Sequence, residues 1–405
     1  EAGFTELHEG EKWELKKNGS YFVTRNQSSI LSFRIPAGTC GGYQIMASHS
    51  DSPTFKIKEN PEMESEGHYI RLNVEKYGGM LCAPWFDRPL SVAGRLVVKA
   101  GNCLVSKLVK VDRDLLMIPN LAIHFNRQVN DGYKYNPQVD MIPLFGGHDS
   151  KGTFMKLVAD AAGVHEEDIL GHDLFLYSRM PGTIWGAGNE FFSCGRIDDL
   201  QCAFASLKGF LESEPAEGIA VHAVFDNEEV GSGTKQGADS TFLMDTLRRI
   251  NTGLGRDEEA YLMALASSFM ISADNAHAVH PNLPDRADPT NRPYMNQGIV
   301  IKYNANQKYT TDAVSAAMFK ALCQRAGVPF QTFANRSDMP GGSTLGNISN
   351  AHVSLNTVDI GLPQLSMHSP YETAGVMDTC YLTKVAAHFY SACIRAGEGG
   401  CYEVV

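Results

Sequence analysis

Two adjacent glutamates follow an apolar run in the middle of this sequence. Glu228 and Glu229 lie in Asp226-Asn227-Glu228-Glu229-Val230-Gly231, directly after Ile219–Phe225. Neighbouring carboxylates repel each other and lose hydration on burial, so a fold keeps them together only beside a compensating partner. A divalent metal ion is such a partner, because one carboxylate can bind it while the other takes a proton from metal-bound water. On this fragment alone, a solvated acidic turn fits equally well.

Four more segments place histidine or carboxylate side chains just after predicted strands. They are His49-Ser50-Asp51, Arg196-Ile197-Asp198-Asp199, Asp274-Asn275-Ala276-His277 and Met367-His368-Ser369. Two imidazoles and three carboxylates suit a pair of zinc-like ions, which lie about 3.5–4 Å apart in two-metal hydrolases and share a bridging carboxylate. In the first segment, Asp51 can accept the proton of the second ring nitrogen of His49 and so orient a metal ligand.

Each segment taken singly also has a structural explanation. Asp198 could cap a helix, and Asp274 could form a turn. His277 could be a surface histidine, and His368 could be a satisfied core histidine or a surface histidine. The common position of all these residues at strand ends favours one shared metal site.

Strand and helix patterns alternate in the part of the chain that must position these residues. We predict strands over 43–48, 219–225, 269–272 and 298–303, and helices over 198–213, 311–326 and 371–394. Alternation of this kind predicts a mostly parallel sheet flanked by helices on both faces. Such sheets bind ligands at the carboxyl ends of their strands, which is where the candidate residues lie.

The segment between these patterns has a different texture. Residues 55–181 read as strand and loop, with alternating runs at Tyr69–Val74, Ser91–Val98 and Leu104–Val111. We therefore predict an α/β domain formed by residues 1–54 and 182–405, with a β-rich domain inserted over 55–181.

Composition excludes several classes of partner. The 405 residues carry 35 basic and 46 acidic side chains, a net charge of -11, which argues against nucleic acid as a partner. No apolar stretch reaches the about 18–20 residues of a membrane span, so we expect no membrane association. The nine cysteines, Cys40 among them, form no Cys-x-x-Cys pair, and free thiols in this number fit a reducing cytoplasm.

Two glycine-rich segments have weaker signals. Gly231–Gly237 follows a strand, but its third glycine comes one residue late for a dinucleotide-binding loop and the preceding acids would repel a pyrophosphate. Met339–Thr344 could offer backbone N–H groups to a substrate, although a plain turn fits as well.

As a set, the motifs resemble the aspartyl aminopeptidase family of cytosolic dinuclear zinc peptidases. The matching stretches occur in the family's order across nearly the whole chain. They are Ala47–Pro53, Leu121–His124, Asp226–Ser232, Ser272–Asn282 and Pro363–Ser369. The family has a further segment before the region that matches Glu1, so the resemblance implies that such a segment precedes this sequence.

The resemblance implies a role for each candidate residue. Two divalent metal ions per subunit are expected, with Zn²⁺ first and Mn²⁺ or Co²⁺ as alternatives. Glu228 would be the general base and Asp51 the residue that orients His49. The implied metal ligands are His49 and Asp274 on one ion, Glu229 and His368 on the other, and Asp198 between them. The implied substrate contacts are His277, Lys302, and His124 from a neighbouring subunit.

The implied activity is release of N-terminal Asp or Glu from peptides by a hydroxide held between two zinc ions. The inserted domain would mediate dimerisation, and dimers would build a cytoplasmic dodecamer. Lys302 would face the acidic side chain, although from the residues alone a strand-end lysine pointing into water is favoured. The alternatives are a broad neutral aminopeptidase on the same fold, an N-acyl amino acid deacylase, and a non-enzymatic oligomer with an inactive site.

Overall fold

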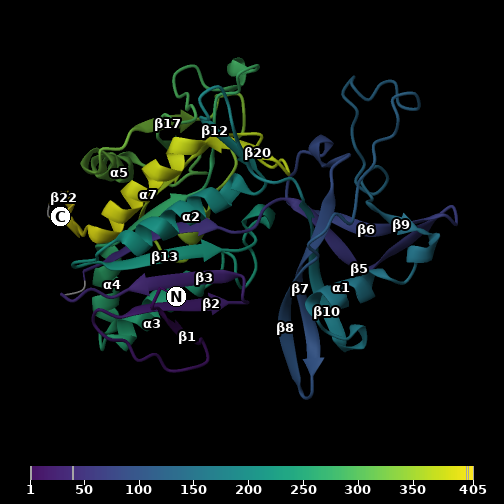
Figure 1. Ribbon diagram of the computed structural model, residues 1–405. Coiled ribbons are helices and arrows are strands. Elements are labelled where there is room, and N and C mark those ends of the chain that lie inside the picture. The colour runs from purple at the N-terminus through teal and green to yellow at the C-terminus, as the bar shows by residue number, and fades with distance from the viewer. Residues whose placement is uncertain (1, 39–40, 398, 400, 405) are drawn as a thin grey trace. The chain divides into compact units, whose positions relative to one another are not determined.

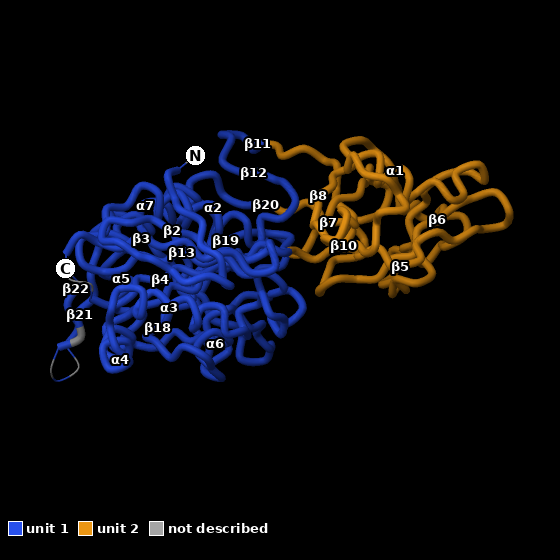
Figure 2. Tube along the Cα trace, turned by 90° about the horizontal axis from the view of Figure 1, so that it is seen from below, with its two compact units in different colours: residues 1–51, 184–367, 373–405 blue, residues 52–183, 368–372 orange. Residues whose placement is uncertain are grey.

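The chain divides into two compact units in a computed structural model that describes residues 2–38, 41–397, 399 and 401–404. Unit 1 comprises Glu1–Asp51, Ile184–Met367 and Thr373–Val405, and unit 2 comprises Ser52–Thr183 and His368–Glu372 (Figure 2). The segment 55–181 falls inside unit 2.

A nine-stranded sheet runs through unit 1 in the order β1-β2-β3-β13-β4-β14-β18-β16-β17 (Figure 1). Its central strands β13, β4, β14 and β18 are parallel, whereas β3 and β16 run antiparallel to their inner neighbours. The strands are β1 (Thr5–Leu7), β2 (Ser20–Arg25), β3 (Ser29–Arg34), β4 (Tyr43–His49), β13 (Ile219–Phe225), β14 (Phe269–Ala273), β16 (Ile299–Tyr303), β17 (Phe330–Ala334) and β18 (Asn356–Gly361). The predicted α/β sheet is therefore confirmed, with its parallel part at the centre.

Helices cover both faces of this sheet (Figure 1). Met46 of β4 packs in one apolar cluster with α2, α5 and α7, whereas Ile45 and Ala47 pack in a second cluster with α3, α4 and α6. Successive strand residues point to opposite faces, so one apolar strand supplies both cores. The helices are α2 (Ile197–Glu212), α3 (Phe242–Gly253), α4 (Glu258–Ala266), α5 (Ala313–Ala326), α6 (Leu345–Ser349) and α7 (Val376–Ser391).

The predicted helix over 371–394 was wrong at both ends. Its first residues form the strand β20 (Glu372–Gly375), and α7 begins only at Val376 and ends at Ser391. A Cβ on Gly375 would lie 2.6 Å from side-chain oxygens of Asn296 and Asp378, so only glycine permits this close strand-to-helix turn. Short apolar runs fit both periodicities, which is why the pattern concealed the strand.

A smaller sheet and several short elements complete unit 1. The sheet has the order β11-β12-β20-β19-β15, and a separate hairpin pairs β21 with β22. The remaining strands are β11 (Thr183–Trp185), β12 (Phe191–Cys194), β15 (Ala276–His277), β19 (Pro363–Leu365), β21 (Ile394–Ala396) and β22 (Tyr402–Val404), and the single-turn helices of this unit include Glu228–Val230 and Pro284–Arg286.

Unit 2 is an antiparallel sheet in the order β8-β7-β10-β5-β6-β9 with one helix, α1. Phe154 and Val158 of α1 pack into a core with Phe55, Leu72 and Leu174. The elements are β5 (Thr54–Ser65), β6 (Tyr69–Tyr77), β7 (Leu90–Ala100), β8 (Cys103–Lys110), β9 (Leu144–Gly147), α1 (Phe154–Ala162) and β10 (Ile169–Ser178), with single turns at Ala83–Trp85, His148–Ser150 and Glu166–Asp168. The predicted alternating runs are confirmed as β6, β7 and β8.

Two further features concern the described residues as a whole. Within them, no helix combines the length and apolar character needed to cross a bilayer. The eight cysteines in the described ranges are free thiols, and Cys40 lies outside those ranges.

Candidate active site and metal centre

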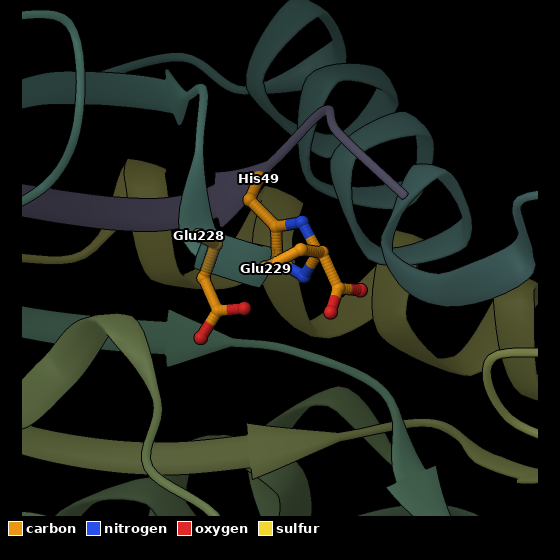
Figure 3. Close-up of side chains that lie close together, drawn as sticks. All are labelled: His49, Glu228 and Glu229. Carbon is orange, nitrogen blue, oxygen red and sulfur yellow. The ribbon is translucent and has the colours of Figure 1, made fainter. Parts of the chain in front are cut away.

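The parallel register brings three strand ends together at one edge of the main sheet. Phe225 of β13 pairs with His49 at the end of β4, and Ala47 of β4 pairs with Ser272 near the end of β14. Glu228 and Glu229 follow β13 in a single helical turn, and Asp274 follows β14. Figure 3 shows the side chains of His49, Glu228 and Glu229 lying close together.

Two groups of potential ligands lie within unit 1. One consists of His49, Glu228 and Glu229, and the other of His49, Asp198 and Asp274; in each, one ligand atom per residue lies within 4.8 Å of the others. His49, Asp198 and Asp274 are buried. An imidazole nitrogen surrounded by carboxylate oxygens is a zinc donor set, so these residues fit a zinc ion.

Asp198 reaches this site from the irregular start of α2. Arg196 precedes the helix with φ 64°, and both Asp198 (φ -77°, ψ 110°) and Asp199 (φ -118°, ψ 21°) are non-helical, with a cis peptide between them. Asp198 Oδ1 lies 3.3 Å from His49 Nε2. The carboxylate of Asp198 is therefore directed at the ring of His49.

Asp199 is a second buried carboxylate, to which the sequence analysis gave no role. Its Oδ2 accepts a hydrogen bond from the backbone N–H of His49 at 3.1 Å. Burial, together with the nearby carboxylates of Asp274 and Asp198, raises the pKa of Asp199 well above its usual range. The only signal in sequence was its position in a pair of acids, which solvent-exposed turns also contain.

Asp51 lies beside the ring of His49, as expected of an orienting residue. Asp51 Oδ1 is 3.3 Å from His49 Nδ1, and the Asp51 carbonyl oxygen is 3.1 Å from the same nitrogen. Burial alone would lower the pKa of His49, but hydrogen bonding to Asp198 and Asp51 raises it well above its usual value. A cation that binds His49 must therefore displace a proton.

Glu228 has the electrostatic character of a general base. Burial, and next the carboxylate of Asp274, raises the pKa of Glu228 to about 7. A base is most effective when its pKa lies near the operating pH.

Lys302 is buried rather than exposed to water, so the solvent-facing interpretation is wrong. Its Nζ donates a hydrogen bond to the Asn275 carbonyl oxygen at 2.8 Å and lies 3.6 Å from Asp274 Oδ1. Burial would lower the pKa of Lys302, but the Asp274 carboxylate raises it above its usual value. Lys302 is therefore a permanent cation at the edge of the site, with the ring of Tyr309 centred 5.6 Å from Nζ.

A buried network of side-chain amides surrounds Asn275, whose carbonyl oxygen binds Lys302. No sequence pattern predicted this network. Asn275 Nδ2 donates to Gln201 Oε1 at 2.8 Å and to Gln364 Oε1 at 2.9 Å, and the Cys202 thiol donates to Asn275 Oδ1 at 3.3 Å. These contacts fix the backbone that carries Asp274 and the carbonyl that holds Lys302. Amides and thiols without charge or motif spacing give no functional signal in sequence.

The remaining three predicted site residues belong to neither of these two groups. His277 is exposed on β15, 6.1 Å ring to ring from Phe333, and lines a cavity of about 260 Å³ with Arg286, Arg336 and Met339. His124 is exposed in the loop between β8 and β9 of unit 2. His368 begins the five-residue segment grouped with unit 2, where its backbone N–H donates to Glu372 Oε1 at 2.8 Å.

Comparison with known proteins gives consistent matches over almost the whole sequence. Residues 1–390 match the family model described as Aminopeptidase I zinc metalloprotease (M18). The chain is 49% identical over 399 residues to a probable M18 family aminopeptidase 2 of Clostridium acetobutylicum, covering 96% of this chain and 92% of the relative.

Solved structures agree with the sequence matches. A chain in the structure of the Ape4 and Nbr1 complex superposes with a TM-score of 0.93 at 35% identity, covering 96% of this chain and 80% of that one. The mApe1 dodecamer of S. cerevisiae gives a TM-score of 0.83 at 27% identity, covering 96% and 90%. The resemblance seen in the motifs is thereby confirmed: this chain belongs to the M18 family of zinc metallo-aminopeptidases, which are peptide hydrolases.

Proposed function

We propose that the enzyme uses two divalent cations, with zinc as the first choice. The observation that carries this proposal is the buried convergence of His49, Asp198 and Asp274 beside Glu228 and Glu229. So many carboxylates in one place repel one another unless cations lie between them. The proposed ligands are His49 and Asp274 for one ion, Glu229 and His368 for the other, and Asp198 for both.

Glu228 performs the proton transfers in this proposal. When bound, the cations polarise the scissile carbonyl and lower the pKa of a water molecule. Glu228 takes the proton of the attacking water and delivers it to the nitrogen of the leaving amine, so the peptide bond breaks without net consumption of the base. His277, exposed beside the site, contacts the substrate.

We further propose a preference for peptides whose N-terminal residue is Asp or Glu. Lys302 keeps its charge in a buried position and has three donors, of which one is used by the Asn275 carbonyl and one points toward Asp274. The third donor can pair with an acidic side chain. The contact between Lys302 and Asp274 also favours a second candidate, a neutral aminopeptidase in which Lys302 pairs only with Asp274 and not with the substrate.

Assembly and location are proposals of the same kind. We propose a homo-oligomer, with unit 2 as the dimerisation domain and His124 acting on a neighbouring active site. One similar structure is described as a dodecamer, which supports a dodecamer built of dimers here. Free thiols in the described ranges support a cytoplasmic location.

The test is hydrolysis of Asp-, Glu- and Leu-p-nitroanilide by the zinc-loaded protein and by Glu228→Gln. Metal-dependent cleavage of the acidic substrates that is lost in Glu228→Gln, while zinc content is unchanged, supports both the base and the specificity. Glu258→Gln, at an exposed position on α4, is the control and should match wild type. Cleavage of the Leu substrate alone would select the neutral aminopeptidase.

A further inference from the structure

Asp359 of β18 is a fully buried carboxylate that receives hydrogen bonds from two separate segments. Its Oδ2 accepts from Thr310 N at 2.6 Å and from Thr310 Oγ1 at 2.7 Å. Its Oδ1 accepts from Thr344 Oγ1 at 2.6 Å. One carboxylate thus joins residues that are far apart in sequence to the central part of the main sheet.

Both segments bound by Asp359 adjoin residues that lie near Lys302 or His277, the proposed substrate contacts. Thr310 directly follows Tyr309, whose ring is next to the Lys302 ammonium group. Thr344 ends the glycine-rich segment Met339–Thr344, of which Met339 and Pro340 line the cavity beside His277. Asp359 itself is among the groups whose negative charge raises the pKa of Lys302.

The residues around Asp359 pack closely against it and add further hydrogen bonds. A Cβ on Gly346 would lie 2.7 Å from Asp359 Oδ1 and 2.8 Å from Oδ2, which is closer than van der Waals contact. Only glycine therefore allows the backbone after Thr344 to approach the carboxylate this closely. Thr311 Oγ1 also donates to the Asp359 carbonyl oxygen at 3.4 Å and lies 2.9 Å from its backbone nitrogen. A buried carboxylate depends on its donors, and charge-assisted bonds of this length are the strong ones.

We infer that Asp359 is a positioning residue that fixes Tyr309 and the glycine-rich segment Met339–Thr344 at the substrate side of the active site. It is neither a metal ligand nor a proton carrier. It acts through Tyr309, which lies beside Lys302, and through Thr344, which anchors one wall of the cavity. The kinetic part of this inference rests on the proposed function, whereas the structural part does not.

The first test compares Asp359→Ala with Asp359→Asn by hydrogen–deuterium exchange of the zinc-loaded protein. Alanine removes all the acceptors, so exchange should rise in residues 304–312 and 339–346 but not in 44–49 or 219–225. Asparagine can accept both Thr310 donors and donate to Thr344 Oγ1, so it should restore wild-type exchange. Asp378→Ala is the matched control, since Asp378 is also buried and accepts from the backbone N–H groups of Asn296 and Gly298.

Kinetics give the second readout, on whichever p-nitroanilide the wild type cleaves. Asp359→Ala should raise KM about tenfold with kcat and zinc content little changed, because misplaced binding groups weaken substrate binding without removing the base. Asp359→Asn should recover most of the KM. The inference is overturned if Asp359→Ala leaves exchange in both segments unchanged, or raises it throughout unit 1 rather than in these two segments.

If Asp359→Ala does not fold, Thr344→Val tests the positioning role of Asp359 instead. This nearly isosteric change removes one donor, so exchange should rise in 339–346 and stay unchanged in 304–312. Unchanged exchange in 339–346 would overturn the inference. Inactive wild-type protein with the expected exchange pattern would contradict the proposed function and leave the positioning role standing.

Discussion

The carboxylate of Asp51 accepts a hydrogen bond from the backbone N–H of Glu228, with Asp51 Oδ1 3.0 Å from Glu228 N. Its second oxygen accepts from the backbone N–H of Glu229 at 3.1 Å. Because the same carboxylate lies beside the ring of His49, it links this proposed ligand to the proposed base Glu228 and to the proposed ligand Glu229. Asp51 therefore sets the relative position of groups that come from two different strands.

Asp51→Asn should weaken zinc binding and slow catalysis together. The two backbone N–H groups donate to different oxygens of Asp51, and asparagine replaces one of these oxygens with an NH₂ donor. One N–H group of the turn that carries Glu228 and Glu229 therefore loses its acceptor, and the ring of His49 loses its anionic neighbour. We expect zinc affinity to fall about 10- to 100-fold, as for other residues that orient a metal ligand. Competition with a chromogenic chelator measures this. Asp112→Asn, at an exposed position, is the control, and an unchanged zinc affinity in Asp51→Asn would contradict the linking role.

Removing the metal should lower the melting temperature of the protein. Without cations, the buried carboxylates of Asp198, Asp199 and Asp274 repel one another, and the folded state alone offers this ligand set. Zinc at about 100 times its Kd should stabilise the fold by about 2.7 kcal/mol. At a fixed zinc concentration the gain should shrink as the pH falls, because the raised pKa of His49 means that zinc must displace its proton. Calorimetry after chelation, with and without added zinc, measures both effects; an equal gain in Asp198→Asn would argue against this site.

Lys302→Met should change substrate preference more than overall activity. A charge-assisted hydrogen bond contributes about 1.5–3 kcal/mol, so losing it should cut kcat/KM for Asp-p-nitroanilide by about 10- to 100-fold. The Leu substrate should change much less. Lys308→Met is the matched control, since Lys308 is exposed a few residues further along the chain. If kcat/KM falls equally for both substrates and zinc affinity also falls, Lys302 stabilises Asp274 and does not bind the substrate side chain.

Residues next to buried strands could be predicted as site residues from sequence. His49, Glu228 and Asp274 adjoin the apolar runs of β4, β13 and β14, and parallel strands must end at the same edge. That rule predicts from the sequence that these residues converge. Asp198 was harder to place, because it follows a strand of the smaller sheet and only the irregular start of α2 carries it to His49.

Other functional features depend on packing that no local pattern records. Lys302 lies one residue before the end of the apolar strand β16, where lysine usually reaches water, and its burial depends on the segment at Asn275, whose carbonyl oxygen it contacts. Asp359 sits within a strand, and the donors that explain it come from residues 310 and 344. Contacts between distant segments are invisible to periodicity, so these roles needed the structure.

His222 should make the stability of unit 1 depend on pH in a defined window. This β13 residue is buried, its Nδ1 lies 3.3 Å from Ser206 Oγ, and burial lowers its pKa from 6.5 to about 4. The folded state therefore binds fewer protons than the unfolded state between these values. Stability contributed by neutral His222 is present above about pH 6.5 and is lost as the pH falls toward 4, by about 3 kcal/mol in all.

The test is the free energy of unfolding of metal-free protein between about pH 7 and pH 4, for wild type and His222→Asn. Asparagine reaches the position of Nδ1 and carries no titratable proton, so the variant should be less stable at neutral pH because its side chain is smaller. Its stability should nevertheless fall less steeply on acidification, with the difference between the two proteins narrowing by about 3 kcal/mol. His165→Asn, at an exposed position, should keep the wild-type slope. Parallel curves for wild type and His222→Asn would show that burial does not keep His222 neutral.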